Sequence, residues 1–284
     1  MSNLIDGKLV SEKLRDALTK ETAAFIKQTQ VIPHLVVIIV GQDPASMTYV
    51  RNKKKACEAI GFKSTIIELE QTVTEAQLLE VIEALNQDEH VHGILVQLPL
   101  PKHINEDHVV AAIDVLKDVD GFHPYQIGCL AAGIEGLTPC TPTGVMQLLK
   151  AYDVDITGKH AVILGRSNIV GKPLIQLLLQ EDATVTICHS KTQNLAEITR
   201  QADILIAAIG QAHFVTATMI KTGAVIVDVG INRLESGKLV GDVDFDNVAA
   251  KARYITPVPG GVGPMTITML LKNTLKAAKS QREC

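Results

Sequence analysis

The sequence of 284 residues contains no tryptophan, and aromatic residues make up only 3% of it. Such a composition leaves few platforms on which the bases of single-stranded nucleic acid could stack. A basic excess is missing too: 27 Lys and Arg stand against 31 Asp and Glu, giving a formal net charge of −4. Dedicated nucleic-acid-binding proteins usually carry a basic face, so we expect no nucleic-acid partner.

Long apolar runs and paired cysteines are absent as well. No segment approaches the roughly 20 apolar residues that span a bilayer, and the charged start, MSNLIDGKLVSEKL, lacks the apolar stretch of a signal peptide. We therefore expect no membrane partner and a cytoplasmic protein, with a trimmed organellar transit peptide as an open alternative. The cysteines are odd in number, scattered and never spaced C-x-x-C, which favours reduced thiols over disulfides or a metal site: Cys57, Cys129, Cys140, Cys188 and Cys284.

Short apolar runs alternate with amphipathic stretches along the whole chain. This order is typical of an α/β fold in which helices cover parallel strands on both faces. Val- and Ile-rich runs predict strands at 34–41, 62–69, 92–100, 161–165, 184–188, 204–210, 224–230 and 254–258. Helical spacing predicts helices at 49–61, 74–87, 172–180, 194–202 and 266–279.

The length indicates two domains, at roughly 150 residues each. Two prolines and a glycine interrupt the pattern within 137–154, so we place the main boundary near Thr138. The sequence thus predicts two α/β domains with a cleft between them. The first spans 1–138 and is completed by a C-terminal helix at 266–284; the second, at 139–265, is a Rossmann-type dinucleotide-binding domain.

The Rossmann-type prediction depends on the segment KHAVILGRSNIVGKPLIQLLLQ at 159–180, which has the pattern of a strand, a glycine-containing turn and a helix. Pro173 fits the first helical turn, where a proline forfeits no hydrogen bond. Free backbone N–H groups and the positive end of the helix dipole would face a phosphate. The spacing from Gly165 through Ser167 is G-x-S-x-x-x-G, not G-x-G-x-x-G, and an ordinary strand-to-helix turn fits it about as well.

The turn after the next predicted strand favours NADP over NAD. An NAD site usually has an acidic residue there, bonded to the ribose 2′-hydroxyl. Here the strand TVTIC runs into His189-Ser190-Lys191-Thr192, which has donors and a cation but no carboxylate, and Arg166 adds a second positive charge. The alternative is a solvated turn that happens to be basic.

One lysine in the run at 53–55 shares a helix face with small and apolar residues. Tyr49, Lys53, Ala56 and Ile60 follow the spacing i, i+4, i+7, i+11, which predicts that Lys53 faces inward. Desolvation disfavours the charged form of a lysine, so an inward Lys53 could serve as a general base or acid. The commoner arrangement is a buried stem with its ammonium in water.

Polar residues also interrupt two other segments. Gln97 lies near the end of the predicted strand in HGILVQLPLP, and the carboxyl ends of parallel strands are where α/β proteins bind ligands. An amide bonded to a neighbouring loop is an equally consistent interpretation. VLKDVDGFHP brings Asp118 and Asp120 to a glycine turn, but Asp-Val-Asp recurs at 153–155 and 242–244 and is not specific by itself.

Five segments occur in the order found in one enzyme family: Tyr49 to Lys53, GILVQLPLP, KDVDGFHP, GRSNIVGKP and TPVPGGVGPMT. With them the chain resembles the bifunctional methylenetetrahydrofolate dehydrogenase/methenyltetrahydrofolate cyclohydrolase enzymes over essentially its whole length. The stretch from GILVQLPLP through KDVDGFHP and the stretch PGGVGPMT are quite specific. The length leaves no room for the formyl-ligase domain of some relatives, which favours the stand-alone bifunctional form.

The resemblance implies oxidation of 5,10-methylenetetrahydrofolate with NADP and hydrolysis of the methenyl product to 10-formyltetrahydrofolate, in one-carbon metabolism and purine biosynthesis. It implies a homodimer whose first domain binds folate. Lys53 would be the catalytic lysine, Tyr49 would orient the folate, and Gln97 would bond and tune the lysine. Asp120 would hold the pterin ring, with Asp118 nearby.

The resemblance also assigns the cofactor and the loop that would close the predicted cleft. The expected cofactor contacts are Gly165, Arg166, Ser167, Ser190 and Ile231, and the expected closing loop includes Gly260, Gly261 and Pro264. An ion bridging the cofactor phosphate would leave no spacing signature. Two alternatives remain open: another NADP-linked dehydrogenase with a small substrate, and a non-catalytic nucleotide-binding module.

Overall fold

The computed structural model describes residues 3–282, so Cys284 lies outside the described residues. The chain divides into two compact units. The three-stranded unit comprises Lys13–Thr138 and Ile267–Cys284, and the six-stranded unit comprises Met1–Glu12 and Pro139–Thr266. Helices α1 (Gly7–Thr29) and α10 (Val262–Ser280) contribute residues to both.

The three-stranded unit is a parallel sheet of β2 (His34–Val40), β3 (Lys63–Leu69) and β4 (Gly93–Val96), in the order β3-β2-β4. Every residue of β2 is buried, which explains its unbroken apolar run. The unit also contains the helices α2 (Pro44–Ala59), α3 (Glu75–Gln87), α4 (Glu106–Ala112) and α5 (Pro124–Ala132).

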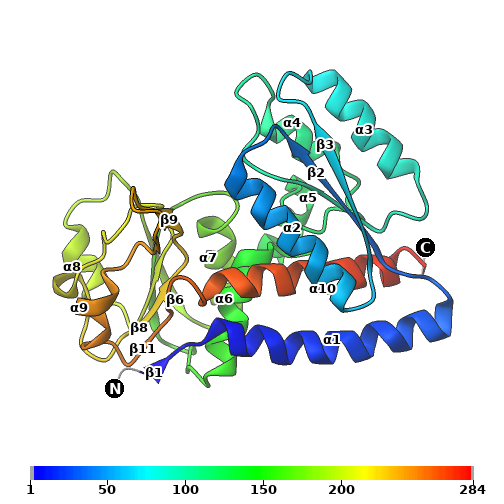
Figure 1. Ribbon diagram of the computed structural model, residues 1–284. Coiled ribbons are helices and arrows are strands. Elements are labelled where there is room, and N and C mark those ends of the chain that lie inside the picture. Colours follow the sequence, from blue (N-terminus) through cyan, green and yellow to red (C-terminus); the bar gives the residue numbers. More distant parts are fainter. Residues whose placement is uncertain (1–2, 283–284) are drawn as a thin grey trace. The chain divides into compact units, whose positions relative to one another are not determined.

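Helix α3 covers one face of this sheet (Figure 1). Thr74 begins the helix with a capping box, in which its hydroxyl accepts the Gln77 N–H and the Gln77 side chain accepts the Thr74 N–H. The fully buried Leu78 and Ile82 pack in one apolar cluster with alternate residues of β2. Burying each of these side chains contributes roughly 2–3 kcal/mol.

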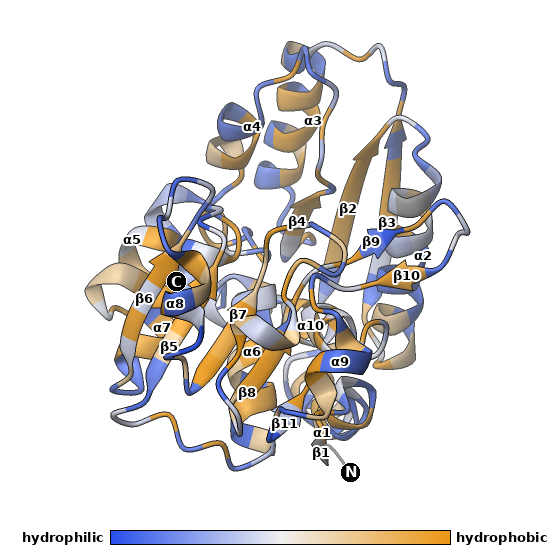
Figure 2. Ribbon diagram, turned by 90° about the vertical axis from the view of Figure 1, so that its left-hand side faces the viewer, coloured by the Kyte–Doolittle hydropathy of each residue, from blue (hydrophilic) through white to orange (hydrophobic). Residues whose placement is uncertain are grey.

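The six-stranded unit is a parallel sheet in the order β1-β11-β8-β7-β5-β6, and Figure 2 shows β5, β7 and β8 as largely hydrophobic. Its strands are β1 (Asn3–Leu4), β5 (His160–Leu164), β6 (Thr184–Cys188), β7 (Ile204–Ala207), β8 (Val225–Asp228) and β11 (Tyr254–Ile255). Its helices are α6 (Cys140–Ala151), α7 (Gly171–Gln180), α8 (Leu195–Thr199), the 3₁₀ turn η1 (Ala217–Met219) and α9 (Phe245–Ala249), and β9 (Asn232–Arg233) pairs antiparallel with β10 (Leu239–Val240).

Strand order reverses at β5, because β6 lies on one side of it and β7 on the other. The carboxyl ends of strands at such a switch point form the usual binding crevice of doubly wound α/β sheets. The predicted α/β class, with a Rossmann-type second part, is therefore confirmed. Among the described residues, no helix is both long enough and apolar enough to cross a membrane.

The structure departs from the predicted elements in ways that have physical causes. The strand predicted at 92–100 ends at Val96, because the Leu98–Pro99 segment cannot continue the ladder. The strand predicted at 204–210 ends at Ala207, where the backbone turns through Gly210 at φ +67°. Strand β1 is too short to show a hydrophobic period, so the sequence pattern does not reveal that residues 3–12 belong to the six-stranded unit and not to the domain predicted at 1–138.

Candidate active site

Lys53 lies on α2, which follows β2 in the three-stranded unit. Asp43 caps this helix by accepting the Ser46 N–H at 2.8 Å. Lys53 is only 4% exposed, whereas the side chain of Lys54 is 43% exposed. The predicted inward placement of Lys53 is confirmed, and the alternative of an ammonium in open water is wrong.

The amine of Lys53 faces two of the other predicted site residues. Its Nζ donates a hydrogen bond of 3.0 Å to Gln97 Oε1 and lies 4.7 Å from the centroid of the Tyr49 ring. The other end of the amide is held as well, because Gln97 Nε2 donates to the Leu98 carbonyl at 2.8 Å. The oxygen of Gln97 is thereby directed at the lysine.

The two acidic residues of the KDVDGFHP segment have different surroundings. The carboxylate of Asp118, 1% exposed, accepts the N–H groups of Gly121 at 3.2 Å and His123 at 2.8 Å. Burial raises the pKa of Asp118 to about 7, against the lowering effect of these bonds. Burial also raises the pKa of Asp120, while the positive charge of Lys53 lowers it. Asp118 thus shapes the turn, and Asp120 interacts with the lysine.

This Lys-Gln-Asp-Tyr cluster, meaning Lys53, Gln97, Asp120 and Tyr49, combines a desolvated amine with groups that orient it. A buried amine beside an amide and a carboxyl can donate or accept a proton next to a reacting carbon. The ring of Tyr49 offers a flat surface to an aromatic substrate. The cluster is therefore suited to proton transfer on a bound heterocycle.

The predicted dinucleotide loop joins β5 to α7 at the switch point of the six-stranded unit. Gly165 adopts φ +111°, and a Cβ there would collide with the carbonyl oxygen of Ala208. A Cβ on Gly171 would collide with the Gly165 carbonyl in turn. Ser167 Oγ accepts the N–H of Val170 at 3.2 Å, which stabilises the turn into the helix. The close packing requires glycine at both positions.

The donors around this loop fit a phosphorylated dinucleotide. Arg166, Ser167 and Ser190 are all exposed. The turn after β6 is ordered by its own bonds: the His189 N–H donates to Thr192 Oγ1 at 2.9 Å, and the Lys191 N–H donates to His189 Nδ1 at 3.1 Å. No carboxylate occurs between Cys188 and Thr192, so the donor set is cationic and neutral.

The remaining predicted residues meet at one hollow of the six-stranded unit, with a volume of about 160 Å³. Ile231 lines it after β8, and Gly260, Gly261 and Pro264 line it from the loop before α10. This loop is tied to the start of α1, because the Lys8 N–H donates to the Gly260 carbonyl at 3.1 Å. Ile231 is 60% exposed.

Sequence reasoning missed two buried carboxylates beside this hollow, Asp228 and Asp242. Asp242 accepts N–H groups of the segment after β7, and Asp228 accepts N–H groups of the segments after β8 and β10. Asp228 interrupts the apolar run AVIVDVG, and that interruption is a signal that could have identified it. Asp242 belongs to the Asp-Val-Asp triplet that gave no specific prediction.

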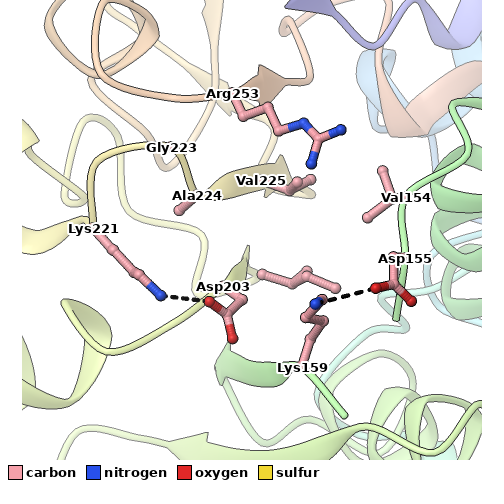
Figure 3. A pocket seen from close by; sticks show the side chains of 10 residues that line it. Val154, Asp155, Lys159, Asp203, Lys221, Gly223, Ala224, Val225 and Arg253 are labelled. Carbon is pink, nitrogen blue, oxygen red and sulfur yellow. Dashed lines mark hydrogen bonds and ion pairs between the residues drawn. The ribbon is translucent and has the colours of Figure 1, made fainter. Parts of the chain in front are cut away.

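A larger hollow of about 260 Å³ lies at the opposite, amino-terminal edge of the same sheet (Figure 3). Its charged groups largely neutralise one another, because Lys221 pairs with Asp203 at 2.6 Å and Lys159 pairs with Asp155 at 3.1 Å. Parallel α/β sheets bind ligands at the other edge. Within residues 3–282, no group of three or more His, Cys, Asp or Glu side chains is placed to hold a metal ion.

Comparison with known protein families matches both parts of the chain. Residues 5–120 match the catalytic domain of tetrahydrofolate dehydrogenase/cyclohydrolase, and residues 139–282 match its NAD(P)-binding domain. The chain belongs to the tetrahydrofolate dehydrogenase/cyclohydrolase family. The Lys-Gln-Asp-Tyr cluster falls within the matched catalytic domain, and the dinucleotide loop falls within the matched NAD(P)-binding domain.

Individual family members are similar over nearly the whole length. The chain is 57% identical over 278 residues to "Bifunctional protein FolD" of Campylobacter hominis, covering 98% of each chain. It is 54% identical to the bifunctional enzyme FolD of Campylobacter jejuni, whose crystal structure gives a TM-score of 0.96 with 99% of each chain covered. A FolD structure from Trypanosoma brucei, complexed with NADP and an inhibitor, is 42% identical with a TM-score of 0.96, covering 100% of this chain and 99% of that one.

Proposed function

We propose that this chain oxidises 5,10-methylenetetrahydrofolate with NADP⁺ and hydrolyses the resulting 5,10-methenyl cation to 10-formyltetrahydrofolate. The observation that carries the proposal is the buried Lys53 amine bonded to Gln97, inside a chain that matches the family at both domains. NADP, when bound, accepts the hydride. The residues of this chain bind, orient and move protons.

In the oxidation step, the main requirement is positioning, because hydride transfer needs two planar ring systems held in contact. Tyr49 supplies a ring face for the pterin, and Asp120 supplies a carboxyl that bonds its polar edge. The raised pKa of Asp120, caused by its burial, keeps the carboxyl able to share a proton with a ring nitrogen. Lys53 limits that rise through its charge.

In the hydrolysis step, water attacks the cationic methenyl carbon, a C–O bond forms, and a C–N bond breaks as the ring opens. Lys53 takes the proton of the attacking water and returns a proton to the departing nitrogen. Gln97 can hold the amine in either protonation state, because its oxygen accepts a bond without adding charge. The second proton of the water is released as the remaining C–O bond becomes the formyl C=O, so one proton leaves overall.

We further propose that Arg166 and Ser190 select NADP over NAD by contacting the 2′-phosphate. The absence of a carboxylate from the 188–192 turn supports this choice. Gly165 and Ser167 would then bring backbone N–H groups to the pyrophosphate, with Ile231 beside the nicotinamide. Gly260, Gly261 and Pro264 would shape the nearby loop that lines the same hollow as Ile231.

The chain would act as a homodimer in the cytoplasm. The expectation of reduced thiols supports this location, since the four described cysteines are buried and form no disulfide with one another: Cys57, Cys129, Cys140 and Cys188. Size-exclusion chromatography with light scattering tests the dimer, which a monomeric mass would rule out.

A two-part absorbance assay tests the proposed activity. Purified protein with methylenetetrahydrofolate and NADP⁺ should form NADPH, and protein with methenyltetrahydrofolate alone should remove the methenyl absorbance faster than buffer does. Turnover of another small alcohol or amino acid, without the folate, would support a different dehydrogenase. Nucleotide binding without either turnover would support a non-catalytic module.

A further inference from the structure

The segment that follows β7 is held by a single side chain from far along the sequence. Asp242 Oδ2 accepts the N–H of Ile209 at 2.7 Å and of Gly210 at 3.0 Å, and Asp242 Oδ1 accepts the N–H of Gln211 at 2.8 Å. Three consecutive backbone donors thus converge on one carboxylate. Asp242 is 0% exposed, so these bonds replace the hydration that the charge loses on burial.

The same carboxylate reaches a second segment beside the proposed cofactor site. Asn232 Nδ2 donates to Asp242 Oδ1 at 2.9 Å, and Asn232 directly follows Ile231 in the sequence. Asp242 therefore joins the 208–211 turn after β7 to the beginning of β9. The segment with Ile231 lines the hollow, and the 208–211 turn touches Gly165 at the switch point.

A second buried carboxylate, Asp228, fixes the position of Asp242. Asp228 Oδ1 accepts the N–H of Asp242 at 2.9 Å and of Gly230 at 3.0 Å, and Asp228 Oδ2 accepts the N–H of Val243 at 2.9 Å. The packing leaves no space: a Cβ on Gly230 would collide with the Asp242 carboxylate, and one on Gly241 would collide with the Asp228 carboxylate. Asp228 and its hydrogen bonds therefore hold the backbone of Asp242 in one position.

The 208–211 turn also determines the shape of the dinucleotide loop. The Ala208 carbonyl lies where a Cβ of Gly165 would be, so the two backbones touch at the switch point. The Ala208 N–H also donates to the Leu164 carbonyl at 2.8 Å, immediately before that glycine. A shift of the turn would displace the loop that is proposed to hold the pyrophosphate.

We propose that Asp242 is a positioning residue for the dinucleotide: it sets the 208–211 turn against Gly165 and, through Asn232, sets Ile231. This inference rests on the proposed function, because it assigns these segments to the cofactor site. It predicts that the charge of Asp242 supports cofactor affinity without taking part in the hydrolysis step, whose residues lie in the three-stranded unit.

The substitution Asp242→Asn tests this role, because the amide group places N–H donors against the N–H groups of the turn. The KM for NADP⁺ in the oxidation assay should rise about tenfold or more, since unsatisfied buried groups are costly. Hydrolysis of methenyltetrahydrofolate should stay within about twofold of wild type. The matched control is Asp244→Asn in the same segment. The Asp244 carboxylate accepts the Asn247 Nδ2–H at 2.7 Å, and the substitution should leave both values unchanged.

A KM for NADP⁺ unchanged in folded Asp242→Asn would overturn the proposal, as would an equal loss of hydrolysis, which indicates a global structural effect. If this variant fails to fold, Asn232→Ala serves instead, since it removes one donor and leaves the three backbone bonds. Asn232→Ala should raise the KM for NADP⁺ about threefold, and an unchanged KM for NADP⁺ would overturn the proposal that Asp242 positions Ile231 through Asn232. Fluorescence titration with NADPH measures the affinity for the cofactor without turnover. A wild-type protein that binds NADPH but does not oxidise methylenetetrahydrofolate would refute the proposed function and leave the positioning role of Asp242 open to the binding test.

Discussion

Replacing Lys53 by glutamine separates the two proposed activities. Glutamine keeps an N–H donor for the oxygen of Gln97 but cannot take up or release a proton. Lys53 is 4% exposed and its amine is 3.0 Å from that oxygen, so no bulk water stands ready to replace it as a base. Loss of a positioned general acid–base group costs roughly 10²–10⁴-fold in rate. We expect hydrolysis of methenyltetrahydrofolate to fall by that factor.

Oxidation should fall much less, because hydride transfer moves no proton through the lysine. The remaining loss comes from geometry: Asp120 loses a neighbouring positive charge, and the packing against Tyr49 changes. Loss of one such contact costs about 1 kcal/mol, which is roughly fivefold in rate. The ratio of the two activities should therefore shift at least about tenfold toward oxidation.

Parallel assays of NADPH formation and of methenyl disappearance measure this ratio on the same preparation. Lys54→Gln is the matched control, because it makes the same change one residue along α2, where the side chain is 43% exposed and 3.9 Å from Glu58. Exposed ion pairs contribute little, so this variant should keep both activities. Equal losses of oxidation and hydrolysis in Lys53→Gln would refute the proton-transfer role.

Three further outcomes follow from the described contacts. Arg166→Ala should raise the KM for NADP⁺ by roughly 10–100-fold and leave that for NAD⁺ nearly unchanged, in steady-state kinetics, because a charge-assisted bond to phosphate is lost; equal effects would exclude the 2′-phosphate contact. Gly165→Ala should lower the free energy of unfolding, measured in urea, by roughly 2–4 kcal/mol, because a residue with a Cβ is strained at φ +111° and its Cβ would collide with the Ala208 carbonyl. A decrease below about 1 kcal/mol would contradict the close contact between Gly165 and Ala208. Nδ1 of His92 accepts the His34 N–H at 3.1 Å, and burial lowers the pKa of His92 to about 4, so its contribution to the free energy of unfolding should be complete above pH 6.5 and decrease by roughly 2 kcal/mol as pH drops toward 4. The variant His92→Asn keeps an acceptor that does not titrate in this range, so urea unfolding at several pH values should show a smaller decrease in its free energy of unfolding. A decrease as large as in the wild type would exclude His92 as the cause.

The placement of Lys53 follows from sequence because a helix has one period, and the residues that share its stripe are apolar. Val50, Cys57 and Ile60 are buried around it as that period requires. Gln97 could be noticed for a similar reason, since an amide interrupts an otherwise apolar strand. In each case a local pattern of residue types carries the information.

Asp242 shows what such patterns omit. Its bonds reach the N–H groups of residues 209–211, and every residue except proline has an N–H, so the donors leave no mark in the sequence. The sequence also does not show that Asp118 and Asp120 have different surroundings. That difference arises because the N–H groups of Gly121 and His123 donate to the carboxylate of Asp118. The ligand assignments of these residues stay predictions.

The pairing of Asn3 with Tyr254 and of Leu4 with Ile255 also bears on how the protein is made. Strand β1 cannot complete its ladder until the roughly 250 residues that separate it from β11 have been translated, a wait of some tens of seconds at about 5–20 residues per second. An affinity tag fused directly to the amino terminus, or a fragment cut at the middle of the chain, would remove or crowd this late-docking edge.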